Sequence, residues 1–222
     1  MAVMEEVQRV VIGKEDCIRK AMAAILAGGH ILIDDIPGVG KTTLAMAFSK
    51  AMALESKRIQ FTPDVMPSDI LGFSMYQKQS GIFEYQPGAV MCNLFLGDEI
   101  NRTSPKTQSA LLEVMEENSV TVDGVTRNVP EPFIVIATEN PAGSVGTQML
   151  PESQLDRFML CMTMGYPSLE DEIEIAKGKS SGASVEDMNA IIAARELLAI
   201  REAVGEIFVH DKVYYYLCTL VK

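Results

Sequence analysis

Short strand-like segments alternate along the chain with stretches whose apolar residues recur at helical spacing. The segments predicted as strands are 31–33, 56–62, 94–98, 133–137 and 158–163. Helical spacing over 4–27, with a break at Gly13, predicts two helices joined by a turn. Further helices are predicted over 44–51 and after Ser104-Pro105, where serine suits the cap and proline the first helical position. This alternation is typical of an α/β domain.

Two β-hairpins are predicted between these elements. Alternating residues on either side of Gln79-Ser80-Gly81 indicate the first hairpin. Asp123-Gly124 between β-branched runs indicates the second, because this dipeptide favours a two-residue turn with positive φ. The first hairpin carries four aromatic residues, which we expect to pack against other residues and not to contact a ligand: Phe73, Tyr76, Phe83 and Tyr85.

The character of the chain changes near Tyr166-Pro167, where strand-like segments give way to helical spacing. We therefore expect an α/β domain over residues 1–166 and a helical lid over residues 167–222. Amphipathic helices are predicted over 190–198 and 211–221. Because Lys222 falls within an apolar helical pattern, we expect the lid to be incomplete.

Composition narrows the classes of function. The 222 residues include four widely spaced cysteines and two histidines, too few for a zinc site or a Ser/His/Asp triad. A net charge of -11 without a basic cluster disfavours nucleic acid as a partner. The chain has neither an apolar run of membrane-spanning length nor the pattern of a signal peptide at its start, so a cytoplasmic location is expected.

A strand, a glycine loop and a helix start follow one another in residues 31–43. This order predicts a phosphate-binding loop, because Gly38 and Gly40 let consecutive N–H groups face an anion at a helix N-terminus. In this interpretation Lys41 reaches the β and γ phosphates of ATP, and the Thr42 hydroxyl ligates Mg²⁺. The alternative is a plain glycine turn between strand and helix. The predicted nucleotide-binding residues here are Pro37, Gly38, Val39, Gly40, Lys41, Thr42 and Thr43.

Two adjacent carboxylates, Asp98 and Glu99, end the apolar strand that begins at Leu94. Open α/β sheets bind ligands at the carboxyl ends of their strands. Because side chains alternate along a strand, Asp98 can hold the magnesium shell while Glu99 orients or deprotonates the attacking water. A solvated strand end is the alternative, and the phosphate loop in the same chain favours the functional interpretation.

Asn140 and Arg157 are two further candidates. Asn140 follows the strand at 133–137 and could hydrogen-bond the γ phosphate or the attacking water, although an asparagine that caps a turn is the alternative. Arg157 could simply pair with Asp156 or Glu152. It could instead project from the edge of the domain into the site of a neighbouring subunit.

In their order along the chain, these motifs resemble the MoxR family of AAA+ ATPases, which is related to the magnesium chelatase motor subunit. The most specific segments are 98–102, 105–113 and 151–158. The resemblance implies an AAA+ P-loop fold with a five-stranded parallel sheet between helices, two β-hairpin insertions and an all-helical lid.

The resemblance also implies roles for individual residues. Lys41 and Thr42 would belong to Walker A, Asp98 and Glu99 to Walker B, and Asn140 to sensor 1. Arg157 would be an arginine finger that acts on the next subunit, and Val11, Ile12 and Gly13 would lie by the adenine. Asp35 stands where the loop consensus has its first glycine. The lid arginine called sensor 2 would follow the last residue, so weak turnover is expected of this chain.

We therefore expect an Mg-ATP-dependent ATPase with chaperone-like remodelling activity that assembles into a ring homo-oligomer, a hexamer. The family suggests a partner with a von Willebrand factor A domain and a role in metal insertion or the maturation of a complex. A low-turnover, nucleotide-responsive binding module is the second hypothesis. A nucleic-acid translocase is the third, and the acidic charge disfavours it.

Overall fold

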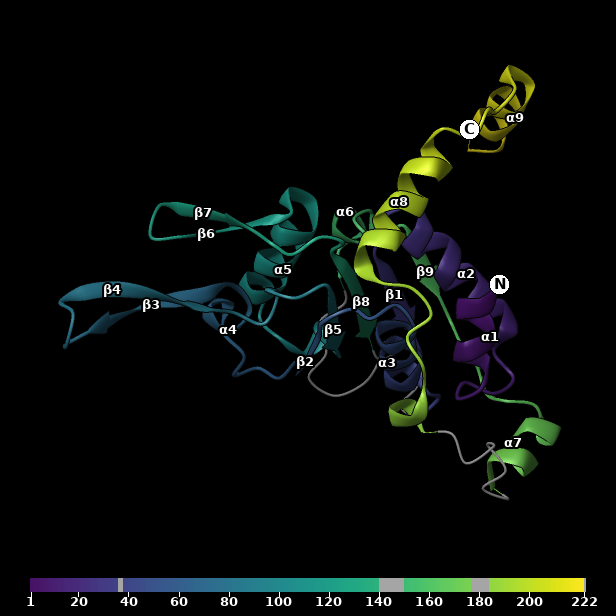
Figure 1. The fold of residues 1–222 in the computed structure, drawn as a ribbon, viewed down its shortest axis with the longest axis horizontal. Helices are drawn as coiled ribbons and strands as arrows, with labels where there is room; N and C mark the ends of the chain where they lie inside the picture. The colour runs from purple at the N-terminus through teal and green to yellow at the C-terminus, as the bar shows by residue number, and fades with distance from the viewer. Residues whose placement is uncertain (36–37, 140–149, 177–183, 222) are drawn as a thin grey trace.

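A five-stranded parallel sheet forms the centre of the protein (Figure 1). The structure is a computed structural model that describes residues 1–35, 38–139, 150–176 and 184–221. The strands follow the order β2-β5-β8-β1-β9, and every pairing in this sheet is parallel. Their bounds are β1 Ile31–Asp34, β2 Ser56–Gln60, β5 Leu94–Asp98, β8 Ile134–Glu139 and β9 Leu160–Met162. The predicted α/β fold is confirmed.

Helices cover both faces of the sheet. Successive side chains of a strand point to opposite faces, so the buried core consists of two clusters, one on each face. Ile31 and Ile33 pack on the face that carries α1 (Ala2–Gln8), α2 (Glu15–Leu26), α3 (Lys41–Ala51) and α8 (Ala194–Gly205). Leu32 packs on the opposite face, with α4 (Pro67–Leu71) and α5 (Pro105–Glu117). Because both faces are covered, the central strands are apolar throughout and not alternately polar.

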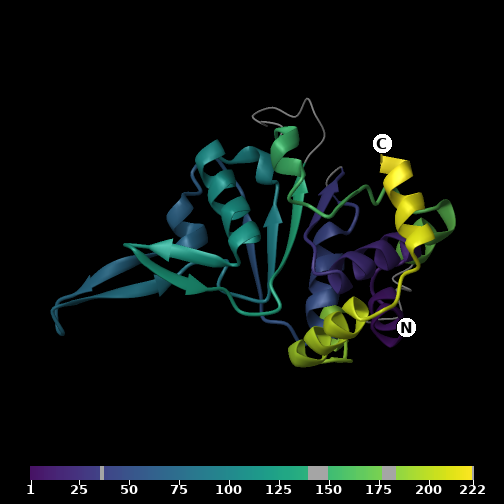
Figure 2. The same ribbon diagram turned by 90° about the horizontal axis from the view of Figure 1, so that it is seen from above.

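Two hairpins project from the same side of the molecule, as both overall views show (Figures 1 and 2). They are β3 (Gly72–Gln77) with β4 (Ile82–Pro87), and β6 (Ser119–Val122) with β7 (Val125–Asn128). Asp123 and Gly124 have φ angles of 52° and 76°, so the predicted two-residue turn with positive φ is confirmed.

The aromatic residues of the first hairpin are mostly exposed, yet three of them pack against neighbouring side chains as expected. The rings of Tyr76 and Phe83 lie 5.3 Å apart, and the Arg127 guanidinium lies 4.1 Å from the centre of the Tyr85 ring. Phe73, Tyr76 and Phe83 are 49%, 52% and 71% exposed. Only Tyr85, at the base of the hairpin, packs against the core, and its hydroxyl donates a hydrogen bond to the carbonyl oxygen of Leu71 at 2.6 Å. Their exposure follows from the position of the hairpin, whose strands project beyond the central sheet.

The described residues after position 166 form helices and connecting segments. They are α7 (Leu169–Ala176), the short 3₁₀ helix η2 (Val185–Asp187), α8 and α9 (Asp211–Val221). Helix α8 begins four residues later than predicted, because the Glu196 carboxylate accepts a hydrogen bond from the backbone N–H of Ala193 and caps it there. None of the described helices has the length and apolar character needed to cross a bilayer.

A buried histidine ties three elements together at the start of β1. His30 Nδ1 accepts a hydrogen bond from the backbone N–H of Val135 at 3.0 Å, and its Nε2 lies 3.1 Å from the carbonyl oxygen of Met115. With Nδ1 as acceptor, Nε2 is the donor, so the ring is held as a neutral imidazole. Burial lowers the pKa of His30 below its usual value.

This arrangement predicts that the protein loses stability as the pH falls. The native pKa of His30 is depressed, so below about pH 6.5 the unfolded chain binds a proton that the native state excludes. The free energy of unfolding should then fall by up to about 1.4 kcal/mol per pH unit from this residue. Urea unfolding between pH 5 and 8 measures this slope. His30→Gln should flatten it and His210→Gln, at an exposed histidine, should not; an unchanged slope in His30→Gln would contradict the assignment.

Candidate functional site

The glycine loop lies between β1 and α3. Gly38 and Gly40 have φ angles of 89° and 92°, in the left-handed region that residues with a Cβ rarely adopt. The loop therefore turns sharply into α3, whose first residue is Lys41. The exposed N–H groups at the start of this helix are suited to an anion. Pro37 lies outside the described residues.

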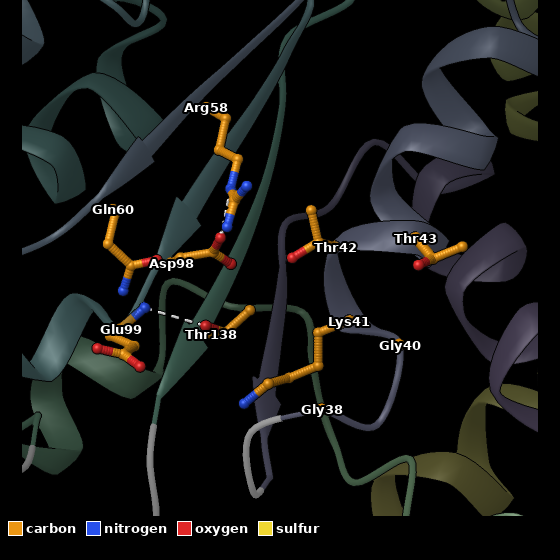
Figure 3. A pocket seen from close by; sticks show the side chains of 10 residues that line it. All are labelled: Gly38, Gly40, Lys41, Thr42, Thr43, Arg58, Gln60, Asp98, Glu99 and Thr138. Carbon is orange, nitrogen blue, oxygen red and sulfur yellow. Dashed lines mark hydrogen bonds and ion pairs between the residues drawn. The ribbon is translucent and has the colours of Figure 1, made fainter. Parts of the chain in front are cut away.

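A cavity of about 340 Å³ opens beside this loop and brings the two predicted motifs together (Figure 3). Lys41 and Thr42 approach it from the loop side, and Asp98 and Glu99 from the end of β5. The full lining is Gly38, Gly40, Lys41, Thr42, Thr43, Arg58, Gln60, Asp98, Glu99 and Thr138. A lysine ammonium, a glycine loop and two carboxylates at one strand edge fit a polyphosphate with its Mg²⁺.

Lys41 is buried and held by the backbone. Its ammonium donates to the carbonyl oxygen of Asp35 at 2.5 Å and lies 3.4 Å from that of Glu139. Burial lowers the pKa of Lys41, and nearby carboxylates, including those of Asp98 and Glu99, oppose this shift. Burial thus penalises the charged form of the lysine, and an anionic ligand in the cavity would stabilise that form.

The two carboxylates are each engaged by an arginine. Asp98 is buried and pairs with Arg58 Nε at 2.6 Å, and Glu99 pairs with Arg102 Nη1 at 2.7 Å. Strand β5 ends at Asp98, and Glu99 adopts a left-handed backbone with φ 58°. Its N–H donates to Thr138 Oγ1 at 3.0 Å. The side chains of Asp98 and Glu99 therefore point in different directions because the backbone turns after Asp98. The expected cause, alternation of side chains along a strand that continues through Glu99, does not apply.

A second cavity, of about 320 Å³, also borders the glycine loop. It shares Gly38, Gly40 and Thr43 with the first cavity, so the two adjoin around the loop. Its lining is Val10, Val11, Ile12, Lys14, Gly38, Val39, Gly40, Thr43, Tyr166 and Pro167. Apolar walls next to a phosphate loop suit a nucleobase.

Two of the three residues predicted near the base, Val11 and Ile12, line this second cavity. Gly13 has a φ of 68° and lies against Asp171 of α7, whose carboxylate would be 2.2 Å from a Cβ at this position. The positive φ favours glycine at this position, whereas the carboxylate of Asp171 is the end of a flexible side chain that can move aside.

Arg157 lies outside both cavities, in a shallow surface site. Its Nη2 pairs with Glu116 Oε2 at 3.0 Å, and its Nη1 donates to the carbonyl oxygen of Ser153 at 3.1 Å. Its partner is therefore Glu116, and not Asp156 or Glu152 as one interpretation of the sequence had it. Asn140 lies outside the described residues.

Comparison with known proteins agrees with this geometry. The sequence model of the ATPase family associated with various cellular activities (AAA) matches residues 30–160. The chain is 46% identical over 219 residues to the YeaC protein of Bacillus subtilis, covering 99% of this chain and 68% of that protein. It is 38% identical over 216 residues to chaperone MoxR1 of Mycobacterium tuberculosis, covering 97% of this chain and 57% of that protein. The chain belongs to the MoxR family of AAA+ ATPases.

A solved structure supports this membership at the level of the whole fold. The crystal structure of a candidate ATPase from Cytophaga hutchinsonii matches with a TM-score of 0.87 at 38% identity, covering 99% of this chain and 67% of that one. The region matched by the family model, residues 30–160, includes the glycine loop and the end of β5.

Several residues of this MoxR-family site were not predicted from the sequence. Arg58 and Gln60 lie on β2, and Gln60 pairs in register with Asp98. Their position depends on β2 lying beside β5, which no local pattern specifies. Tyr166 reaches the second cavity only because the chain returns from β9. Thr138, at the end of β8, follows the rule that parallel strands present functional side chains at their carboxyl ends, and this signal could have identified it.

Proposed function

We propose that the protein is an Mg-ATP-dependent ATPase with chaperone-like remodelling activity, active as a ring in which neighbouring subunits share sites. The observation that carries this proposal is the cavity in which Lys41 and Thr42 face Asp98 and Glu99 (Figure 3). Phosphoryl transfer to water needs positioning and charge stabilisation and no covalent intermediate. The residues around this cavity supply both.

Each residue has a distinct task in this mechanism. Lys41 and the N–H groups of the glycine loop would hold the phosphates, and Thr42 and Asp98 would hold Mg²⁺. Bound Mg²⁺ supplies positive charge to the β and γ phosphates. Glu99 would orient or deprotonate the attacking water, and Asn140 would hydrogen-bond it or the γ phosphate.

The shared site, the hexameric ring and the client belong to the same proposal. Arg157 would act on the site of the next subunit, which requires it to leave Glu116 on assembly. The name of the relative chaperone MoxR1 supports a chaperone role. The proposal also includes a partner with a von Willebrand factor A domain and a cytoplasmic location, both taken from the resemblance to the family.

A low-turnover binding module is the second candidate, and a specific observation favours it. Both carboxylates of the first cavity are paired with arginines, Asp98 with Arg58 and Glu99 with Arg102. A nucleotide could bind at Lys41 without releasing Glu99 for catalysis. Both candidates require nucleotide binding, and they differ in turnover.

Nucleotide binding is tested by replacing the lysine of the loop. Lys41→Met should weaken binding of Mg-ADP about a hundredfold, because charge-assisted hydrogen bonds to phosphate are lost while the buried stem is retained. Titration calorimetry measures the dissociation constant. Lys20→Met is the control, since Lys20 pairs with Asp16 on exposed surface of α2. A parent protein that does not bind Mg-ADP, or a Lys41→Met variant that binds it equally well, would refute the proposal.

A further inference from the structure

The segment that follows β9 forms one wall of the second cavity. Met164 and Gly165 lead directly to Tyr166 and Pro167, which line that cavity. Tyr166 is 75% exposed, so its own packing contributes little to its position. What holds the preceding two residues therefore determines where this wall lies.

The carboxylate of Asp35 holds this segment by accepting hydrogen bonds from two of the segment's backbone N–H groups. Its Oδ2 accepts hydrogen bonds from the N–H of Met164 at 2.7 Å and from that of Gly165 at 2.6 Å. Gly165 has a φ of 64°, and a left-handed residue in such a pair lets two consecutive N–H groups converge on one anion. The carboxylate thus binds the segment as an anion in a backbone nest.

Lys14 holds the same two residues by their carbonyl groups. Its ammonium donates to the carbonyl oxygens of Met164 and Gly165, at 2.9 Å in both cases. Lys14 and Asp35 are 6% and 8% exposed, so these charge-assisted bonds form away from solvent, where they are strongest. We call Lys14, Asp35 and Met164–Gly165 the clasp.

The clasp is continuous with the phosphate loop through Asp35. The carbonyl oxygen of Asp35 accepts the hydrogen bond from Lys41, while its carboxylate holds Met164–Gly165. Asp35 occupies the position where the loop consensus has its first glycine. Glycine there would keep the carbonyl contact and lose the carboxylate contacts.

We infer that Asp35 is a positioning residue for base recognition: through the clasp it fixes Tyr166 and Pro167 as the wall against which the adenine of the nucleotide packs. This inference rests on the proposed nucleotide site. A residue of the phosphate loop would thus determine where the wall of the base cavity lies. This role accounts for a carboxylate at a position where the consensus has glycine.

Asp35→Gly separates this role from phosphate binding, because it restores the consensus of the loop. We expect the dissociation constant of Mg-ADP to rise about tenfold, since two hydrogen bonds to an ionised group are lost. The affinity for inorganic tripolyphosphate with Mg²⁺, which has no base, should stay within about twofold of the parent. Calorimetric titration of both probes gives the ratio of the two affinities, and that ratio is the readout.

Two further variants keep the inference testable if glycine disturbs folding. Asp35→Asn retains an acceptor oxygen without its charge, so the loss for Mg-ADP should be smaller, about threefold, and again absent for tripolyphosphate. Asp16→Asn, at an exposed aspartate of α2, should bind both probes like the parent.

Because the chain contains no tryptophan, Tyr166→Trp supplies a single fluorescent reporter. The fluorescence of this reporter should change when Mg-ADP binds, and adding Asp35→Asn should weaken the change at saturating Mg-ADP. A change of the same size in both proteins would overturn the inference.

The outcomes distinguish the inference from the proposed function. If the parent binds both probes and the Asp35 variants bind Mg-ADP equally well, the inference is wrong and the proposed function stands. If the variants lose both probes to the same extent, Asp35 supports the phosphate loop and not the base, which also overturns the inference. A parent that binds neither probe refutes the proposed function and the inference together.

Discussion

Glu99→Gln is expected to reduce ATP turnover by about two to four orders of magnitude and to leave the affinity for Mg-ATP nearly unchanged. The amide keeps the size of the side chain but cannot accept a proton from water. Glu99 lies at the edge of the phosphate cavity, next to Asp98, and its backbone is held in a left-handed conformation. A residue that is neither glycine nor asparagine adopts this conformation at a cost of about 1 kcal/mol. Such strain is found where the backbone holds a functional side chain in a defined orientation.

Single-turnover hydrolysis and equilibrium binding of Mg-ATP, measured on the same preparation, separate the two effects. Glu113→Gln on the exposed face of α5 is the matched control and should behave like the parent. If Glu99→Gln lowers affinity and turnover equally, the carboxylate supports the site without taking part in hydrolysis. If the parent itself binds Mg-ATP and hydrolyses it no faster than Glu99→Gln, the low-turnover module becomes the better description.

The parts of the fold that are encoded locally could be predicted from the sequence. The glycine loop, the carboxylates that end β5 and the Asp123-Gly124 turn each depend on neighbouring residues in the chain. Alternation between Ile31, Leu32 and Ile33 also shows why a strand covered on both faces is apolar throughout. For these elements, local conformation and burial lead to the same prediction.

The features that were missed depend on contacts between distant segments. Arg58 meets Asp98 only because β2 lies beside β5, and Asp35 meets Met164 only because β9 lies beside β1. The exposure of Phe83 follows from the projection of its hairpin beyond the sheet. Strand order and the covering of each face are properties of the assembled sheet, which periodicity does not specify.

Arg157→Ala is expected to lower turnover by about three to five orders of magnitude, with little effect on nucleotide affinity, if the arginine acts on the neighbouring site. Arg157 is partly exposed, pairs with Glu116 and does not line either cavity around the glycine loop. It therefore has no means of acting on the phosphates of its own subunit in this arrangement. The parent should show turnover per subunit that rises with protein concentration, because assembly creates the complete site.

Glu116→Gln is the matched control, since it breaks the same ion pair and leaves the arginine in place. A purely local role for the pair predicts equal loss in both variants, whereas the arginine finger predicts loss in Arg157→Ala alone.

Mixing provides the sharpest test. Arg157→Ala retains Glu99, and Glu99→Gln retains Arg157, so in an equal mixture about a quarter of the interfaces combine both intact residues. Two nearly inactive proteins should therefore recover a substantial part of the parental turnover when they assemble together. Recovery would establish that Arg157 and Glu99 work across a subunit boundary. If the mixture stays inactive although the subunits exchange, or if turnover is independent of concentration and of Arg157, the shared-site mechanism is wrong and the site must be complete within one chain.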